Sequence, residues 1–363
     1  MIWWAIPAFA AAAYYLLALF AAWRWKPHPA GGPTPPISLL KPMYGRDPDL
    51  YDALRSHALQ DYPEFEILFG VRNPNDPAMQ DIQRLQREFP SVPIRVVVVE
   101  GDAPNAKALS VARLAEHARY PILVINDDDI LVEPGYFRAV AAPFQDPRTG
   151  VVTCLFRGRA GSWATRAEAM GIATEFAPSA MVARLLGVIE FALGATMAVR
   201  ADILLEIGGF EPIADYLADD YQLGLRVTQK GYQVAFAAAT VETGLGSGNW
   251  SEVWQHQLRW ARTVRISRPS GYYGYIVTNA TFWALVAFAA AQWWPGTLAL
   301  LLRILAGWVV GGRMLKDREV RRWFWLLPLR DLFALAIWTG ACFGSTVYWR
   351  GRKLHLAPGG RLR

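Results

Sequence analysis

Between residues 37 and 125 the chain alternates short apolar runs with amphipathic stretches, a pattern typical of strands and helices in turn. Strands are predicted at 37–41, 65–71, 94–99 and 120–125, and helices at 49–59, 79–88 and 106–117. Because strands that are apolar on both faces belong to parallel sheets covered by helices, the pattern predicts an α/β domain with a mostly parallel sheet. Ligands bind such sheets beyond the carboxyl ends of the strands.

A different pattern opens the chain. Residues 2–23 carry no charge and are long enough to cross a bilayer as a helix. The basic residues Arg24 and Lys26 follow this run instead of preceding it, which favours a retained anchor over a cleaved signal peptide. The positive-inside rule then predicts that residue 24 and the domain after it are cytoplasmic.

Further membrane-length candidates are 276–294, 296–312 and 327–348. The first two are predicted to form a hairpin about Pro295, followed by a basic, cytoplasmic loop at 313–322. The last segment could span the membrane, but spanning would put the basic residues 350–353 outside, against the charge rule. The alternative is that it is re-entrant or interfacial. Three spans are therefore expected, and a fourth stays open.

These segments divide the chain into regions. A Pro/Gly-rich linker (KPHPAGGPTPP) joins the first apolar segment to the α/β domain. The predicted regions are an anchor at 1–24, a linker at 25–36, the α/β domain at 37–250, an amphipathic interface helix at 251–270, a C-terminal membrane region at 271–350 and a basic tail at 351–363.

Composition narrows the functional classes. A hydrophobic content of 53% with a mean hydropathy of +0.15 is too apolar for an ordinary soluble protein. The net charge of +6 comes from basic residues beside apolar segments, which fits anionic headgroups better than nucleic acid. The two cysteines, Cys154 and Cys342, lie in different regions and imply no disulfide framework or thiolate metal site. Neither GxGxxG nor a P-loop occurs, so a Rossmann dehydrogenase or an NTPase has no support.

The acidic run Asp127–Asp129 directly follows a predicted buried strand. The first and third carboxylates, Asp127 and Asp129, can approach one divalent ion, and such oxygen ligands suit Mg²⁺ or Mn²⁺ on a diphosphate. The alternative is a solvated loop or a helix N-cap. A buried strand that leads into three like charges is costly without a cation, which favours the metal site.

Two further acidic positions also follow apolar runs. Asp76 precedes Pro77, and taken alone it is best explained as a helix cap with proline at the first helical position. Asp219 and Asp220 are flanked by apolar residues and are candidates for a general base. Their alternative explanation is the capping of a helix through 223–229.

Residues 251–266 are predicted to form an amphipathic helix, with an apolar stripe at Trp254, Leu258 and Ala261. His256, Arg259 and Trp260 share one side at i, i+3 and i+4, where they can meet an anionic leaving group. The alternative is a helix that lies in the headgroup layer whatever the function.

The chain resembles the membrane-bound, processive-type glycosyltransferases of the A fold (GT-A) in the order of four motifs. These are an Asp, an Asp-x-Asp sequence, a later Asp and an Arg-Trp pair. Over nearly its whole length the chain most resembles the ceramide glucosyltransferases and their bacterial relatives, including hopanoid-associated glycosyltransferases. The segments that carry this resemblance are Leu39-Leu40-Lys41-Pro42, Asp61-Tyr62-Pro63, Asp76-Pro77-Ala78, Asp219-Asp220-Tyr221 and Arg259-Trp260.

The resemblance implies a role for each candidate. Asp76 would contact the uracil or ribose of a UDP-sugar, with Lys41 and Lys107 nearby. Asp127 and Asp129 would hold Mg²⁺ or Mn²⁺ and the diphosphate. Asp220, supported by Asp219, would take the proton of the acceptor hydroxyl. Arg259 and Trp260 would steady the departing UDP and shape the acceptor site, which His256 supports. A single displacement implies inversion at the anomeric carbon.

The chain departs from the family at three positions. His256 replaces a Gln or Arg, Ala177 replaces a His of the animal ceramide enzymes, and Asp129 stands where those enzymes have a small residue. The hopanoid-associated relatives share a His at position 256, so the sugar and lipid stay open.

The expected function is glucose transfer from UDP-glucose to ceramide at the cytoplasmic face of a bacterial inner membrane. Its partners would be a UDP-sugar, a membrane lipid and the bilayer, and no nucleic acid. The alternatives are transfer of N-acetylglucosamine or another sugar to a hopanoid, a polysaccharide synthase, and a non-catalytic lipid-binding protein.

Overall fold

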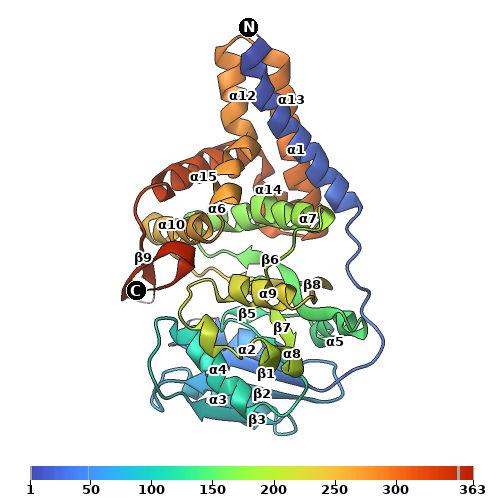
Figure 1. Ribbon diagram of the computed structural model, residues 1–363, viewed down its shortest axis with the longest axis vertical. Helices are drawn as coiled ribbons and strands as arrows, with labels where there is room; N and C mark the ends of the chain where they lie inside the picture. The colour runs from blue at the N-terminus through green and yellow to red at the C-terminus, as the bar shows by residue number, and fades with distance from the viewer. Residues whose placement is uncertain (1, 48, 350–351, 363) are drawn as a thin grey trace.

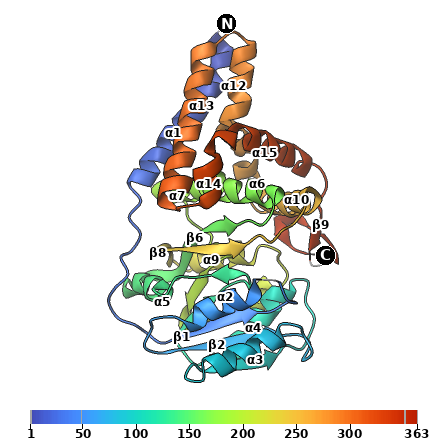
Figure 2. The same cartoon turned by 180° about the vertical axis from the view of Figure 1, so that it is seen from behind.

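The computed structural model describes residues 2–47, 49–349 and 352–362. Figure 1 shows three tiers: an α/β domain with an eight-stranded sheet, a layer of helices above it, and a column of helices that ends at the N-terminus. The C-terminus lies beside the middle layer. Residues 24–36 run along the side of the molecule from the column to the sheet (Figures 1 and 2).

The sheet has the order β3-β2-β1-β4-β7-β6-β8-β5. Its strands are β1 (Ile37–Pro42), β2 (Phe65–Val71), β3 (Ile94–Val98), β4 (Ile122–Ile125), β5 (Ile130–Leu131), β6 (Thr149–Arg159), β7 (Met197–Arg200) and β8 (Gln233–Gly244). Strand β1 pairs in parallel with β2 and β4, and β2 pairs in parallel with β3. The four strands predicted before residue 125 and their parallel order are thus confirmed.

Beyond β4 the sheet becomes mixed. Strand β7 runs antiparallel between β4 and β6, and β5 runs antiparallel to β8, while β6 and β8 are parallel. An antiparallel strand enters the sheet at the edge where its parallel neighbours end. The segment before β7 therefore lies beside the residues that follow β4.

Helices cover both faces of the sheet, as the continuous apolar strands predict. On one face α2 (Leu50–Ala58), α3 (Met79–Glu88) and α5 (Tyr136–Ala141) contribute to a buried cluster that contains Leu39 and Phe69. On the other face α4 (Ala106–His117), α8 (Ala201–Glu206) and α9 (Asp219–Gln229) share a second buried cluster, which contains Leu40 and Leu68. Neighbouring residues of β1 and β2 point to opposite cores, as the two-residue period of a strand requires.

The middle layer and the column hold the remaining helices (Figure 1). The middle layer contains α6 (Trp163–Gly171), α7 (Ala177–Leu185), α10 (Trp250–Ser267), α11 (Pro269–Gly274), α14 (Arg318–Trp323) and α15 (Leu327–Ala341). The column contains α1 (Ile6–Trp23), α12 (Ala280–Ala289) and α13 (Trp293–Gly307), which continues as a π-helix to Met314. Both views show these three helices side by side, and α15 crosses below them.

By length and composition, three helical stretches in the described residues can cross a membrane: Trp3–Trp23, Trp293–Met314 and Arg318–Ala341. This set differs from the predicted one. The segment 276–294 contributes only the shorter Ala280–Ala289, and its turn comes at Ala291, which has a φ of 57°, not at Pro295. Pro295 lies in the first turn of α13.

The last apolar segment, 327–348, also differs from the prediction. Its helix ends at Ala341, and residues from 346 onward form β9 (Thr346–Trp349), which pairs antiparallel with β10 (Arg352–His355). Beyond this hairpin, the Leu362 N–H donates to the Asp215 carbonyl at 2.7 Å. The region predicted as a basic tail is therefore attached to the α/β domain.

Gly224 of α9 lies against the backbone of Phe191, and a substitution there tests this close packing. A Cβ at Gly224 would lie 2.5 Å from the Cα of Phe191, a backbone atom that cannot move aside alone. We expect Gly224→Ala to lower the free energy of unfolding by about 1–3 kcal/mol. Gly135→Ala is the matched control, because its Cβ would meet nothing within 4 Å. The measurement is the thermal midpoint of both variants, and equal midpoints would contradict this packing.

Candidate active site

Strand register explains how the acidic residues meet. Ile125, the last residue of β4, lies opposite Leu40 on one side and Met197 on the other. Lys41 and the residues that precede Met197 therefore lie beside the run that begins at Asn126. The Asn126 side chain, fully buried, donates to the Ala195 carbonyl at 2.6 Å. Lys41 donates to the Asp127 carbonyl at 2.9 Å, so both sides of the acidic loop are fixed.

The far end of this loop is held by β8. Ile130 lies opposite Thr243, and the Thr243 hydroxyl donates to an Asp129 carboxylate oxygen at 2.6 Å. The acidic run Asp127–Asp129 is thus fixed at the edge of the sheet by β1, by β8 and by the segment before β7. It is not a freely solvated loop.

Helix α4 brings Lys107 to the same place. Asn105 caps this helix by accepting from the Ala108 N–H at 3.0 Å, and its amide donates to the Tyr216 carbonyl at 2.7 Å. The start of α4 is therefore tied to the segment that leads into α9. The Lys107 ammonium lies 2.7 Å from Asp127 and 3.2 Å from Asp219, and it bridges acidic residues that are distant in the sequence.

Asp220 lies in the first turn of α9 and points toward the segment before β7. Its carboxylate accepts from the Gly194 N–H at 3.0 Å and from the Tyr221 N–H at 2.7 Å. A Cβ on Gly194 would lie 3.4 Å from an Asp220 oxygen and 3.9 Å from an Asp127 oxygen. The two carboxylates therefore face one space, which a glycine keeps open.

Burial changes the proton affinity of these groups. Burial raises the pKa of Asp220 to about 6, and the negative charge of Asp219 adds to the rise while Lys107 opposes it. The pKa of Asp129 is raised to about 7 by burial and then by the charge of Asp127, against the hydrogen bond from Thr243. Both carboxyls hold protons more tightly than ordinary aspartates.

Burial and the neighbouring aspartates also shift the pKa values of the two lysines, in opposite directions. Burial lowers the pKa of Lys41 to about 8, although the neighbouring aspartates raise it. Burial also acts to lower the pKa of Lys107, but the charges of Asp127 and Asp219 outweigh it and raise that pKa overall. Lys41 and Lys107 face a larger set of carboxylates: Asp127, Asp128, Asp129, Asp219 and Asp220.

This excess of negative charge suits a divalent cation. Among the described residues, no group of three or more His, Cys, Asp or Glu side chains has the geometry of a complete metal site. An ion at Asp127 and Asp129 would therefore need further oxygen ligands from a phosphate or water, which is how Mg²⁺ is commonly bound. The residues present fit an ion shared with a diphosphate.

Asp76 lies apart from this cluster and is not a cap of α3. The helix begins at Met79, as predicted, and its N-cap residue is Ala78, so the expectation that Asp76 caps it with Pro77 at the first helical position was wrong. The Asp76 carboxylate instead holds the preceding turn, accepting from the Ala78 N–H at 2.9 Å. It also accepts from the Gly45 N–H at 3.3 Å, and so links the loop after β2 to the loop after β1.

His256, Arg259 and Trp260 lie on α10 in the middle layer. His256 is 2.6 Å from the buried Glu168 of α6, and its ring contacts the Trp260 ring with centroids 4.7 Å apart. The helix packs against α15, with Trp254 beside Phe333.

The C-cap residue of α10, Arg268, lies beside the residue that follows Asp220. Arg268 forms an ion pair with Glu190, and its guanidinium lies 5.8 Å from the ring centroid of Tyr221, the neighbour of Asp220. Ala177, which the resemblance places at the position of a histidine, is buried at the start of α7.

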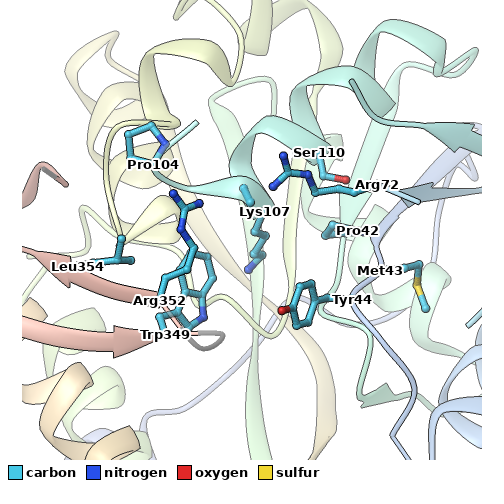
Figure 3. A pocket seen from close by; sticks show the side chains of 11 residues that line it. Pro42, Met43, Tyr44, Arg72, Pro104, Lys107, Ser110, Trp349, Arg352 and Leu354 are labelled. Atoms are coloured by element: carbon cyan, nitrogen blue, oxygen red, sulfur yellow. The ribbon is translucent and has the colours of Figure 1, made fainter. Parts of the chain in front are cut away.

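A cavity of about 200 Å³ opens beside Lys107 (Figure 3). Its lining comes from the loops after β1 and β2, the start of α4, and the hairpin β9–β10. The lining residues are Pro42, Met43, Tyr44, Arg72, Pro104, Ala106, Lys107, Ser110, Trp349, Arg352 and Leu354. Of these residues, only Lys107 is predicted from the sequence to have a ligand role. Arg72, Trp349 and Arg352, as well as Gly194 and Thr243, are not among the site residues predicted from the sequence.

The chain is similar to known glycosyltransferases in sequence and in fold. A family model described as Glycosyl transferase family 21 matches residues 3–362. Ceramide glucosyltransferase 1 of Caenorhabditis elegans is 24% identical over 347 residues, which cover 91% of this chain and 73% of the relative. A ceramide glucosyltransferase of Komagataella phaffii is 33% identical over 114 residues, 28% of this chain and 22% of the relative.

Among solved structures, a mannosyltransferase from Pyrobaculum calidifontis in complex with GDP-Man and Mn²⁺ has the same fold, with a TM-score of 0.58. It is 17% identical, and the match covers 93% of this chain and 97% of that one. The expected GT-A fold, an α/β domain with apolar helices, is therefore confirmed.

Proposed function

Because this chain belongs to glycosyl transferase family 21, and is therefore a glycosyltransferase, we propose that it transfers glucose from UDP-glucose to the hydroxyl of ceramide. The observation that carries this proposal is the meeting of Asp127, Asp219 and Asp220 around Lys107, at the carboxyl ends of the strands. That is where α/β sheets bind ligands. The curated ceramide glucosyltransferases supply the sugar and lipid class.

Asp220 is the general base in this proposal. With a pKa of about 6 it is ionised at neutral pH, yet it is more basic than an ordinary aspartate. It takes the proton of the acceptor hydroxyl while that oxygen bonds to the anomeric carbon. The bond from this carbon to the UDP oxygen breaks, and UDP leaves with the electron pair. One displacement inverts the anomeric configuration.

The other residues bind and orient. Asp127 and Asp129 would hold Mg²⁺ or Mn²⁺, which when bound would neutralise charge on the diphosphate. Lys107 fixes Asp127 and Asp219 in place, and Lys41 fixes the backbone of the acidic loop.

The remaining family positions act at the two substrates. Asp76 contributes to the uracil and ribose side through the loop that it holds. Arg259 and Trp260 steady the departing UDP, and His256, held by Glu168, supports the acceptor site.

The acceptor is proposed to enter from a bilayer. Three helices of membrane-spanning length support membrane association. By the positive-inside rule, Arg24 and Lys26 favour a cytoplasmic α/β domain, which in a bacterium faces inward from the inner membrane.

A second candidate is transfer of N-acetylglucosamine or another sugar to a hopanoid. The observation that favours it is His256, which contacts Trp260. By resemblance, this position holds Gln or Arg in most of the family and His in the hopanoid-associated relatives.

Purified full-length protein in lipid nanodiscs tests both candidates. It would be incubated with UDP-glucose, UDP-N-acetylglucosamine or GDP-mannose, each with ceramide, a hopanoid alcohol or diacylglycerol, and the lipids analysed by mass spectrometry. We expect a hexosylceramide from UDP-glucose alone. A glycosylated hopanoid without hexosylceramide would select the second candidate, and no glycolipid in any combination would overturn both.

The raised pKa of Asp220 predicts a pH dependence. A base must be ionised to accept a proton, so kcat/KM is expected to fall as the pH drops through about 6, approaching about tenfold per pH unit. UDP affinity measured over the same range separates this effect from a change in donor binding, to which Asp129, with a pKa of about 7, contributes. A kcat/KM that stays constant between pH 7 and pH 5 would contradict the assignment.

A further inference from the structure

The C-terminal hairpin forms one wall of the cavity beside Lys107. In its register Trp349 lies opposite Arg352, and Val347 lies opposite Leu354. Successive side chains of a strand point to opposite faces. One face of the hairpin therefore carries Val347, Trp349, Arg352 and Leu354, and the other carries Thr346, Tyr348, Lys353 and His355. The cavity is lined by Trp349, Arg352 and Leu354, all from the first face.

The hairpin is anchored to the α/β domain. Val347 and Leu354 are buried in a small apolar cluster with Leu217, two residues before Asp219. Arg262 of α10 also donates to the Thr346 carbonyl at 2.5 Å. The segment that carries the proposed base and the hairpin are thus packed together, and Trp349 and Arg352 are held at the cavity.

The opposite wall of the cavity also carries an aromatic ring and a basic side chain. Figure 3 shows Tyr44 and Trp349 on opposite sides of the opening, with Lys107 between them and the guanidinium groups of Arg72 and Arg352 nearby. Aromatic rings beside three cations suit a ligand that has both a planar ring and several negative charges. A nucleoside diphosphate has both.

The arginines are available for such a ligand. Arg72 lies 3.5 Å and Arg352 lies 3.9 Å from the carboxylate of Asp102, whose side chain is 72% exposed. Ion pairs at such an exposed carboxylate contribute little. A diphosphate can therefore replace Asp102 as the partner of both arginines at low cost, although Arg72 also donates to the Gly101 carbonyl at 3.0 Å.

We propose that the hairpin β9–β10 is a nucleotide-binding element of the donor site, in which Trp349 packs on the base and Arg352 pairs with the diphosphate. This inference rests on the proposed function, because it assumes a nucleoside diphosphate donor. Lys107, which lines the cavity and also contacts Asp127 and Asp219, connects the nucleotide to the reacting groups. The end of the chain thus completes a site built mainly from its first third.

Calorimetric titration of the full-length protein with UDP and with uridine tests this inference. Trp349→Ala is expected to weaken UDP and uridine alike, by about five- to a hundredfold. Arg352→Gln is expected to weaken UDP by about tenfold and to leave uridine unchanged, since uridine carries no phosphate. The matched controls are Tyr348→Ala and Lys353→Gln on the opposite face, both expected to bind UDP as the wild type does.

Hydrogen exchange of the wild-type protein adds a readout that needs no variant. UDP should slow amide exchange in Thr346–Trp349 and Arg352–His355. Wild-type UDP affinity in both cavity-face variants, or exchange unaffected by bound UDP, would overturn the inference while leaving the proposed function standing. A wild-type protein that binds no nucleoside diphosphate would overturn the proposed function itself.

Discussion

Asp220→Asn is expected to lower glycolipid formation by about a hundredfold or more and to leave UDP affinity close to that of the wild type. The substitution keeps the size of the side chain and its acceptor oxygen for Gly194 or Tyr221, but an amide cannot take a proton. Donor binding is assigned elsewhere, at Asp127, Asp129 and the cavity.

Asp219→Asn is the matched comparison for that experiment. Asp219 lies in the same helical turn and pairs with Lys107, so its loss should weaken turnover less than the loss of Asp220. A purely structural explanation is that both acids stabilise the positive N-terminus of α9. That explanation predicts similar drops in thermal midpoint for the two variants and no selective loss of turnover.

Three measurements on both variants separate these explanations: turnover, UDP affinity and thermal midpoint. Normal turnover by Asp220→Asn would remove Asp220 as the base. Equal losses of turnover in the two variants, each explained by a lower midpoint, would support the structural explanation.

Local patterns were sufficient to predict the first half of the sheet. The apolar runs at 37–41 and 65–71 and the helix periodicity at 106–117 match β1, β2 and α4 within a residue. Parallel strands end at one edge of a sheet, so the sequence also predicted that Asp127–Asp129 would lie at a ligand-binding edge. These features depend on neighbours in the sequence or on a general rule of topology.

Long-range pairing could not be predicted in the same way. Gly194 approaches Asp127 only because β7 runs antiparallel to β4, and Thr243 approaches Asp129 only because β8 pairs with β5. Nothing local to either residue signals this pairing. The partnership of Lys107 with Asp219 likewise depends on Asn105 and its bond to the Tyr216 carbonyl.

Hydropathy also could not predict which apolar segments of the C-terminal third pack on protein. It measures apolar length, and it does not distinguish a helix that faces lipid from one that packs on protein. Helix α15 is apolar, but part of it packs against α10, and the chain turns near Gly344, which has a φ of 74°, into the hairpin. The basic residue Arg352 was interpreted as a topology signal, whereas the hairpin register directs it toward the cavity.

Chelation of divalent metal by excess EDTA is expected to reduce sugar transfer by about a thousandfold or more, and added Mg²⁺ or Mn²⁺ should restore it. The reason is electrostatic, since Asp127 and Asp129 would otherwise face a diphosphate with like charge. UDP affinity should fall with the metal removed, while uridine affinity should not, because uridine has no phosphate. This pair of ligands separates loss of the metal from general damage by the chelator.

The competing possibility is that Lys41 and Lys107 neutralise the site without a metal. Lys41, however, already donates to the Asp127 carbonyl, and Lys107 is shared between Asp127 and Asp219. Neither pairs directly with the Asp129 carboxylate, whose pKa of about 7 reflects burial and the charge of Asp127. Asp129→Asn should therefore weaken the metal dependence of UDP binding more than Asp128→Asn, which removes the same charge at the middle position. Full transfer in excess EDTA, or equal effects of the two substitutions, would exclude the metal assignment and leave the lysines as the cations that face the diphosphate.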